Sequence, residues 1–160
     1  MTIQVGEHLP QATFRVSGAE GPQAKTTDDL FKGRRVVLVG VPGAFTPACH
    51  KNHLPGFVAK REELLARGVD AIAVTSVNDI FVLNAWQQQS GAEGIEFLAD
   101  GNAEFAKAVG LEMDGAGFGL GPRSQRYAML VDDGVVRVLN VEDSPSKAEI
   151  SGAEALLKAL

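Results

Sequence analysis

The run Val36-Val37-Leu38-Val39-Gly40-Val41 is followed directly by Pro42-Gly43-Ala44-Phe45-Thr46-Pro47-Ala48-Cys49. The segment Arg34–Val41 is apolar on both faces, which is typical of a central strand in a parallel sheet. Thr46 is a favourable helix N-cap and Pro47 suits the first helical position, so we predict that a helix begins here. Cys49, the only cysteine in 160 residues, would then lie in the first helical turn.

The segments on either side of this junction alternate between strand and helix patterns. We predict further strands at residues 12–16, 70–76 and 95–98, and a hairpin of 125–131 with 135–141 whose type I′ turn is Asp133-Gly134. We predict helices that begin near Thr26, Thr46, Asn78 and Asn102 and a last one at 153–160, with a break at Pro55 in the second. This order predicts an α/β fold with a mixed central sheet, helices on both of its faces, and one domain over residues 1–160.

Charge and composition argue against several classes of partner. The net charge is −5 and the pI is about 5.2, whereas nucleic acids and anionic membranes are bound by basic surfaces. No apolar run approaches the roughly 18 residues that span a bilayer, and residues 1–10 show no signal-peptide pattern. Because a single free thiol persists best in a reducing compartment, we expect a cytoplasmic protein.

The position of Cys49 favours a reactive thiolate over an inert core cysteine. Unpaired N–H groups and the positive end of the helix dipole stabilise an anion in the first turn. A nearby arginine would stabilise it further, and Arg123 and Arg126 are the candidates because they border the predicted hairpin.

Three other interpretations are weaker. Cys49, His50 and His53 are possible zinc ligands, but a closed site needs four ligands and no second Cys/His cluster follows, so we predict no metal. His53 lies one turn from Cys49 and is a conceivable base for acyl transfer, yet no third member is evident, and we interpret it as a helix-capping or surface residue. The glycines of residues 115–121 lack dinucleotide-binding spacing, so we predict a flexible loop and no cofactor.

The motif Pro42-x-x-x-Thr46-x-x-Cys49 resembles the active-site signature of peroxiredoxins. The following His53-Leu54-Pro55-Gly56-Phe57, and also Ser76–Asp79, Arg123–Arg126 and Leu139–Glu142, resemble the type II subfamily. The similarity extends over essentially the whole chain. It implies a thioredoxin-like fold and a thiol peroxidase that reduces hydrogen peroxide and alkyl hydroperoxides.

The resemblance also implies a role for each residue of the motif. Cys49 would be the peroxidatic cysteine that becomes a sulfenic acid, and Arg126 would stabilise its thiolate and polarise the peroxide. The Thr46 hydroxyl would hold the thiolate and the peroxide oxygen, and Pro42 would shield the sulfur from water. Backbone N–H groups from Gly43 to Cys49 would bind the peroxide oxygens. His50 stands where many relatives carry serine, and we assign it no role.

The chain departs from many relatives because it lacks a second, resolving cysteine. Ile150 stands near one position where relatives carry it and Val74 near the other. We therefore expect an external reductant, with glutathione and glutaredoxin favoured over thioredoxin, and the subfamily implies a homodimer. The alternative is a redox sensor or chaperone-like module in which oxidation of Cys49 is the signal. A disulfide oxidoreductase would need a Cys-x-x-Cys pair.

Overall fold

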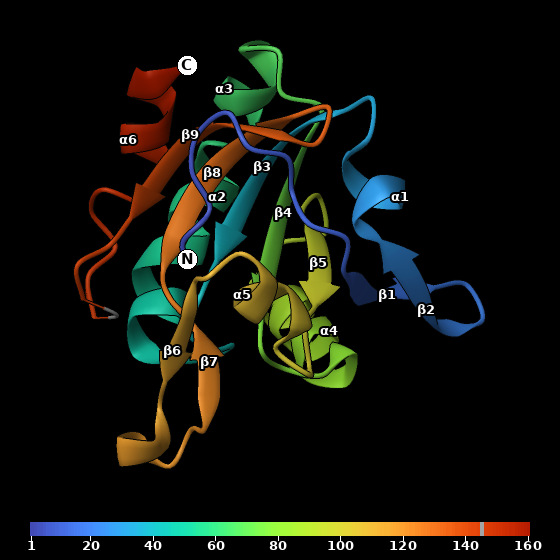
Figure 1. The fold of residues 1–160 in the computed structure, drawn as a ribbon, viewed down its shortest axis with the longest axis vertical. Coiled ribbons are helices and arrows are strands. Elements are labelled where there is room, and N and C mark those ends of the chain that lie inside the picture. The colour runs from blue at the N-terminus through green and yellow to red at the C-terminus, as the bar shows by residue number, and fades with distance from the viewer. Residues whose placement is uncertain (145) are drawn as a thin grey trace.

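The computed structural model describes residues 1–144 and 146–160, and its chain alternates strands and helices around one large sheet (Figure 1). The strands are β1 (Thr13–Gly18), β2 (Gly21–Thr26), β3 (Arg35–Gly40), β4 (Ala71–Ser76), β5 (Glu96–Ala99), β6 (Glu112–Asp114), β7 (Pro122–Ser124), β8 (Tyr127–Asp132) and β9 (Val135–Val141). The α-helices are α1 (Thr27–Phe31), α2 (Leu54–Ala59), α3 (Arg61–Ala66), α4 (Ile80–Gln89), α5 (Glu104–Ala108) and α6 (Ala153–Ala159).

Seven strands form the main sheet in the order β2-β1-β5-β4-β3-β8-β9. The β3–β4 and β4–β5 pairs are parallel, and the other pairs are antiparallel, so the sheet is mixed as predicted. Asp133 and Gly134 have φ angles of 50° and 80°, which confirms the type I′ turn between β8 and β9.

Buried side chains form one core on each face of the sheet. Val37 and Val39 of β3 point into the core that also contains Phe57 of α2, Trp86 of α4 and Leu156 of α6. The neighbouring Val36 and Leu38 point into the opposite core, with Phe31 of α1 and Phe105 of α5. Because successive side chains of a strand face opposite sides, a strand apolar on both faces needs helices on both, which confirms the predicted α/β layers.

Two predicted helix starts are wrong by one or more residues. Asp79, not Asn78, is the N-cap of α4, and its carboxylate accepts from the backbone N–H of Val82 at 2.8 Å. The helix expected at Asn102 begins after Ala103, and the buried Asp100 carboxylate accepts from the N–H groups of Phe105 and Ala106. In both cases an aspartate supplies the charged acceptor that a helix start favours.

Two short hairpins extend beyond the predicted strands. The chain turns after β1 and pairs with it as β2, which is the polar, mostly exposed edge of the sheet. The predicted loop over residues 115–121 connects β6 and β7, and it forms the tip of their two-stranded ribbon with a 3-10 turn at Ala116–Phe118. This ribbon projects from the body of the molecule at the bottom of Figure 1.

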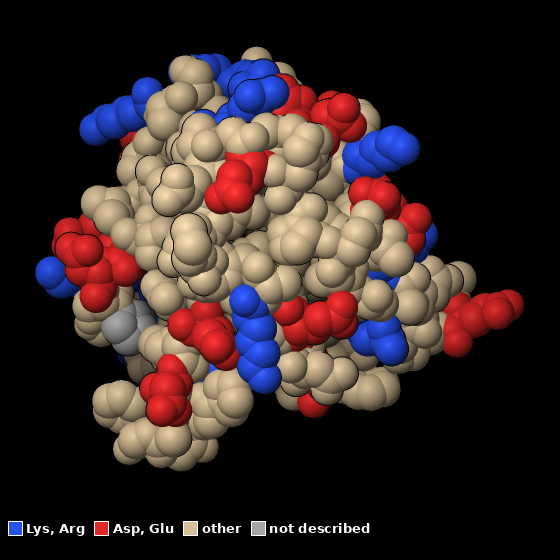
Figure 2. Space-filling model, viewed as in Figure 1, with Lys and Arg blue, Asp and Glu red and all other residues tan. Residues whose placement is uncertain are grey.

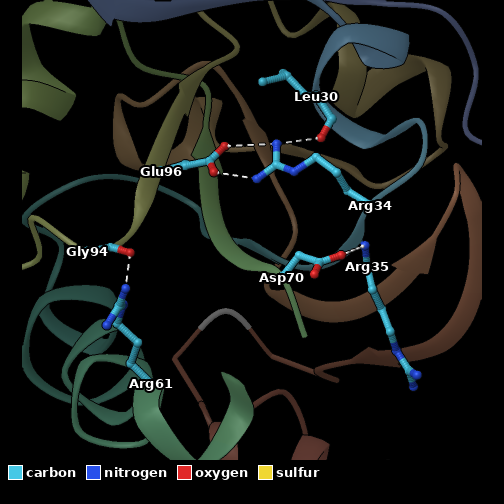
Figure 3. A network of polar contacts seen from close by, with 7 residues as sticks. All are labelled: Leu30, Arg34, Arg35, Arg61, Asp70, Gly94 and Glu96. Carbon is cyan, nitrogen blue, oxygen red and sulfur yellow. Dashed lines mark hydrogen bonds and ion pairs between the residues drawn. The ribbon is translucent and has the colours of Figure 1, made fainter. Parts of the chain in front are cut away.

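Ion pairs and backbone contacts fix the end of the sheet remote from Cys49. The Arg34 guanidinium donates to the Leu30 carbonyl at 2.9 Å and to the Glu96 carboxylate at 2.6 Å, so it joins the end of α1 to β5 (Figure 3). Asp70 accepts from the backbone N–H of Arg35 at 2.8 Å and aligns β3 with β4. No helix among residues 1–144 and 146–160 has both the length and the apolar character needed to cross a membrane.

Candidate active site

Cys49 lies where the loop after β3 turns into a helix, as predicted. Pro47 is the first helical residue, and the backbone N–H of His50 donates to the Thr46 carbonyl at 2.8 Å. Residues Cys49–His53 form a π-helical turn that leads into α2, and the N–H of Leu54 donates to the Cys49 carbonyl. The expected irregularity therefore lies before Pro55, which occupies the first turn of α2. The Cys49 side chain is fully buried.

The loop before Cys49 is held by hydrogen bonds from three directions. The Thr46 hydroxyl donates to the Gly43 carbonyl at 2.7 Å. Within the described part of the chain this hydroxyl makes no hydrogen bond with the Cys49 sulfur. The Asn78 side-chain oxygen accepts from the N–H of Ala44 at 2.9 Å, so the residue predicted to cap α4 fixes this loop instead. Arg123 donates to the Pro42 carbonyl at 3.4 Å.

Gly43 packs closely against Arg123 and Thr46, so a side chain here would require the Arg123 guanidinium to shift. A Cβ atom at this position would lie 2.8 Å from the Arg123 guanidinium and 3.1 Å from the Thr46 methyl group. Both distances are shorter than ordinary van der Waals contact. A glycine therefore lets the loop approach Arg123 and Thr46 closely.

Of the two candidate arginines, Arg126 reaches the sulfur. Its Nη2 donates to Cys49 Sγ at 2.8 Å, and the residue is almost fully buried. The sheet explains how residues so distant in sequence meet. Gly40 pairs with Tyr127 in the antiparallel β3–β8 ladder, so the chain before Tyr127 runs beside the chain after Gly40. The guanidinium is a permanent cation, and it lies in direct hydrogen-bond contact with the sulfur.

The prediction that His53 is a capping or surface residue is wrong. His53 is 1% exposed, and its Nδ1 lies 2.9 Å from Arg126 Nη1 while its Nε2 lies 2.9 Å from the Ser151 carbonyl oxygen. Burial lowers the pKa of His53 to about 4, with a smaller lowering from the Arg126 charge, while the Ser151 hydrogen bond and the Glu142 charge act in the opposite direction. The imidazole is therefore neutral at neutral pH.

Sequence reasoning missed two further buried residues next to His53. The Glu142 carboxylate accepts from both the backbone N–H and the hydroxyl of Ser151, at 2.7 and 2.6 Å. The backbone N–H of Glu142 also donates to the Arg126 carbonyl at 3.0 Å. The signals available in the sequence were the position of Glu142 at the end of a predicted strand and its place in the Leu139–Glu142 segment that resembles the subfamily.

His50 belongs to a separate aromatic group. Its Nδ1 accepts from the Trp86 indole N–H at 3.0 Å, and its ring centre is 5.7 Å from that of Phe45. Both histidines near Cys49 thus bind protein partners through ring nitrogens. Among the described residues, no group of three His, Cys, Asp or Glu side chains is arranged to hold a metal ion.

Three of the predicted site residues border one cavity of about 320 Å³. Pro42, Thr46 and Arg126 line it together with apolar side chains of the β6–β7 ribbon, namely Met113, Phe118 and Leu120. The cavity leads to the loop and helix turn that carry Cys49. A small molecule in it would meet a mostly apolar wall and one cationic side chain.

Comparisons with known proteins agree with this arrangement. The model of the Redoxin family matches residues 4–157. The chain is 50% identical to chloroplastic peroxiredoxin-2E-2 from Oryza sativa subsp. japonica, over 99% of this chain and 73% of the relative. It is 45% identical to peroxiredoxin-2C from the same organism, over 99% and 98% of the two chains.

The fold agrees equally well. The crystal structure of reduced Prx3 in complex with H2O2 from Vibrio vulnificus superposes with a TM-score of 0.94 and 52% identity, over 99% of both chains. The predicted thioredoxin-like fold is therefore confirmed. This chain belongs to the peroxiredoxins of the type II subfamily, which are thiol-dependent peroxidases, and with Cys49 as its single cysteine it is a one-cysteine member.

Proposed function

We propose that Cys49 is the peroxidatic cysteine and that this protein reduces hydrogen peroxide and alkyl hydroperoxides. The observation that carries the proposal is the 2.8 Å contact between Arg126 Nη2 and Cys49 Sγ beside an accessible cavity. A relative at 52% identity has been crystallised in complex with H2O2, which supports peroxide as the substrate.

In the proposed reaction the Cys49 thiolate attacks one oxygen of the peroxide. The new S–O bond forms as the O–O bond breaks, and the electron pair of that bond leaves with the second oxygen. This oxygen takes up a proton and departs as water or an alcohol, while Cys49 becomes a sulfenic acid. Negative charge moves from sulfur to oxygen during the step, and Arg126 is placed to stabilise it at both positions.

The hydrogen bond of Thr46 suggests how the peroxide is oriented. Its hydroxyl hydrogen is directed to the Gly43 carbonyl, so its oxygen lone pairs remain available as acceptors. We propose that Thr46 accepts the O–H of the peroxide and that the N–H groups of the Gly43–Cys49 loop bind the peroxide oxygens. Pro42 borders the same cavity and would exclude water from the sulfur.

An external thiol must complete the cycle, because the chain has no second cysteine. We propose that glutathione condenses with the sulfenic acid to give a mixed disulfide and water, and that glutaredoxin with a second glutathione releases the thiolate. Thioredoxin is the alternative reductant. The cytoplasmic location stays a prediction.

We further propose that the protein forms a homodimer. Phe118, at the tip of the β6–β7 ribbon, is 85% exposed, and burial against a second copy would remove this apolar surface from water. Light scattering on the purified protein measures its mass, and a monomer at micromolar concentration would contradict this part of the proposal.

A single-turnover experiment tests the catalytic assignment. Reduced protein is mixed with one equivalent of hydrogen peroxide, and the sulfenic acid is trapped and identified by mass spectrometry. Cys49→Ser should give no product, and Thr46→Val and Arg126→Ala should slow the reaction about 100-fold or more, the usual effect of losing one preorganised group. Thr46→Ser should retain most of the rate.

Arg137→Ala is the matched control, because it removes an equal charge from an exposed position. If Cys49 of the wild-type protein is not oxidised by micromolar peroxide, its assignment as the peroxidatic cysteine is wrong. A coupled assay with glutathione, glutaredoxin and NADPH then separates an enzyme from a redox sensor. Sustained NADPH consumption supports the enzyme, whereas one burst of oxidation supports the sensor.

A further inference from the structure

A closed ring of hydrogen bonds joins Arg126 to the segment that follows β9. Arg126 Nη1 contacts His53 Nδ1, His53 Nε2 contacts the Ser151 carbonyl, and Ser151 donates twice to the Glu142 carboxylate. The ring closes where the Glu142 N–H donates to the Arg126 carbonyl. All four residues are buried. In water-excluded surroundings such contacts are strong and geometrically restrictive.

The Ser151 carbonyl fixes the tautomer of His53. A carbonyl oxygen only accepts hydrogen bonds, so Nε2 must carry the imidazole hydrogen. In a neutral ring Nδ1 then has a free lone pair, and it accepts from Arg126 Nη1. With one nitrogen held by His53, the planar guanidinium has a defined orientation that directs Nη2 to Cys49 Sγ.

Glu142 in turn fixes the Ser151 carbonyl. Its carboxylate accepts from the N–H and the hydroxyl of Ser151 through one oxygen, Oε2. Hydrogen bonds to an ionised acceptor are shorter and stronger than those between neutral groups. Glu142 therefore holds the backbone of residue 151, between β9 and α6, at the position that His53 requires.

We propose that Glu142 and Ser151 are positioning residues of the peroxide site, which set the reactivity of Cys49 through His53 and Arg126. The inference rests on the proposed roles of Cys49 and Arg126. It assigns Glu142 and Ser151 a function in catalysis although neither of them contacts the Cys49 sulfur. A loss of about 1 Å in the placement of a catalytic group is enough to lower a rate about 100-fold.

The test compares three variants in the single-turnover reaction with hydrogen peroxide. Glu142→Gln keeps the shape but leaves Ser151 a neutral amide oxygen as its acceptor, so the two charge-assisted hydrogen bonds weaken, and the substitution should lower the rate about tenfold or more. Ser151→Ala removes one of the two donors and should lower it several-fold. Asp143→Asn removes an equal charge from the neighbouring exposed residue and should leave the rate unchanged.

A second readout separates positioning from general loss of structure. Alkylation of Cys49 by iodoacetamide needs the thiolate but no polarised O–O bond. In Glu142→Gln the peroxide rate should therefore fall more than the alkylation rate, whereas a merely structural role would lower both equally. Imidazole nitrogen NMR on the wild-type protein should show His53 as the Nε2–H tautomer, with the signal assigned from its absence in His53→Asn.

The outcomes distinguish the two levels of the proposal. If wild-type Cys49 does not react with peroxide, the proposed function fails and this inference with it. If the wild-type protein reacts but a folded Glu142→Gln variant reacts equally fast, the function stands and the positioning role is overturned. An Nδ1–H tautomer in the wild-type protein would also overturn it, and the NMR measurement does not depend on how well any variant at Glu142 folds.

Discussion

His53 is a buried base that faces a permanent cation, and its charge state affects the stability of the fold. A protonated ring would direct an N–H towards the Arg126 guanidinium, so two like charges would meet in a water-excluded site. The lowered pKa of about 4, caused first by burial, prevents this at neutral pH. The same residue thus leaves Arg126 as the cation that contacts the sulfur.

This depressed pKa predicts a pH dependence of stability. In the unfolded chain His53 takes up a proton near the ordinary histidine pKa of 6.5, whereas in the native state it does so only near 4. Between these values the unfolded state binds more protons, so the free energy of unfolding falls as the pH falls. The contribution of His53 to the free energy of unfolding is complete above a pH of about 6.5. It decreases by about 3 kcal/mol as the pH falls from there to about 4.

Urea unfolding of the wild-type protein and of His53→Asn, at several pH values between about 7 and 4, measures this contribution. Asn keeps an acceptor near the position of Nδ1 but does not titrate. The stability difference between the two proteins should therefore shrink as the pH falls. A difference that stays constant over the window would show that His53 is not the titrating group.

At the level of elements, regular patterns were predictable and tertiary hydrogen bonds were not. The strand β3 is apolar on both faces, and Asp133-Gly134 favours a type I′ turn, so both were identified from local sequence. The edge strand β2 was missed because its residues are polar and mostly exposed. Asn78 is a good helix cap by residue type, but the N–H of Ala44 from another part of the chain binds its side chain.

In the candidate site, too, local patterns were predictable from the sequence and tertiary contacts were not. The spacing of Pro42, Thr46 and Cys49 is a local pattern, and the motif directed attention to Arg126. The neighbours Glu142 and Ser151 contact Cys49 only through other residues, and no spacing in the sequence identifies them. His53 was misinterpreted because a histidine on a short helix gives no indication of its burial until the helix is packed.

Two glycines in neighbouring elements should respond oppositely to alanine. Gly40 pairs with Tyr127 across β3 and β8, and an added Cβ would overlap the buried tyrosine ring. Gly40→Ala should therefore destabilise the protein by about 2 kcal/mol, as is usual for overpacking in a core. Gly56 lies in α2 with open space around it, and Gly56→Ala should stabilise by about 0.5 to 1 kcal/mol.

Urea unfolding of both variants beside the wild-type protein measures these changes. Because both substitutions add one methyl group to a glycine, the comparison isolates the surroundings of each site. Equal effects in the two variants would contradict the close packing of Gly40 against Tyr127. A Gly40→Ala variant that is more stable than the wild-type protein would also contradict this close packing.

For the whole molecule, the net charge of −5 affects the two halves of the proposed cycle differently. Acidic and basic side chains are interspersed over the face in Figure 2, and this face shows no single acidic patch. The net charge is therefore treated as a diffuse negative field around the molecule. Hydrogen peroxide is neutral and does not respond to this field. The glutathione thiolate carries a net negative charge, and the field repels it.

We therefore predict that salt accelerates reduction but not oxidation. Raising the ionic strength from about 0.01 to 0.15 M shortens the Debye length from about 30 to 8 Å, which screens the repulsion and should increase the rate of reaction of the Cys49 sulfenic acid with glutathione about two- to fivefold. The rate of oxidation by hydrogen peroxide should stay constant over the same range. Cysteamine is the matched control, because its ammonium group cancels the charge of its thiolate, and its rate should change little. Salt dependence of the peroxide step, or equal dependence for the two thiols, would show that local contacts rather than the net charge govern access to Cys49.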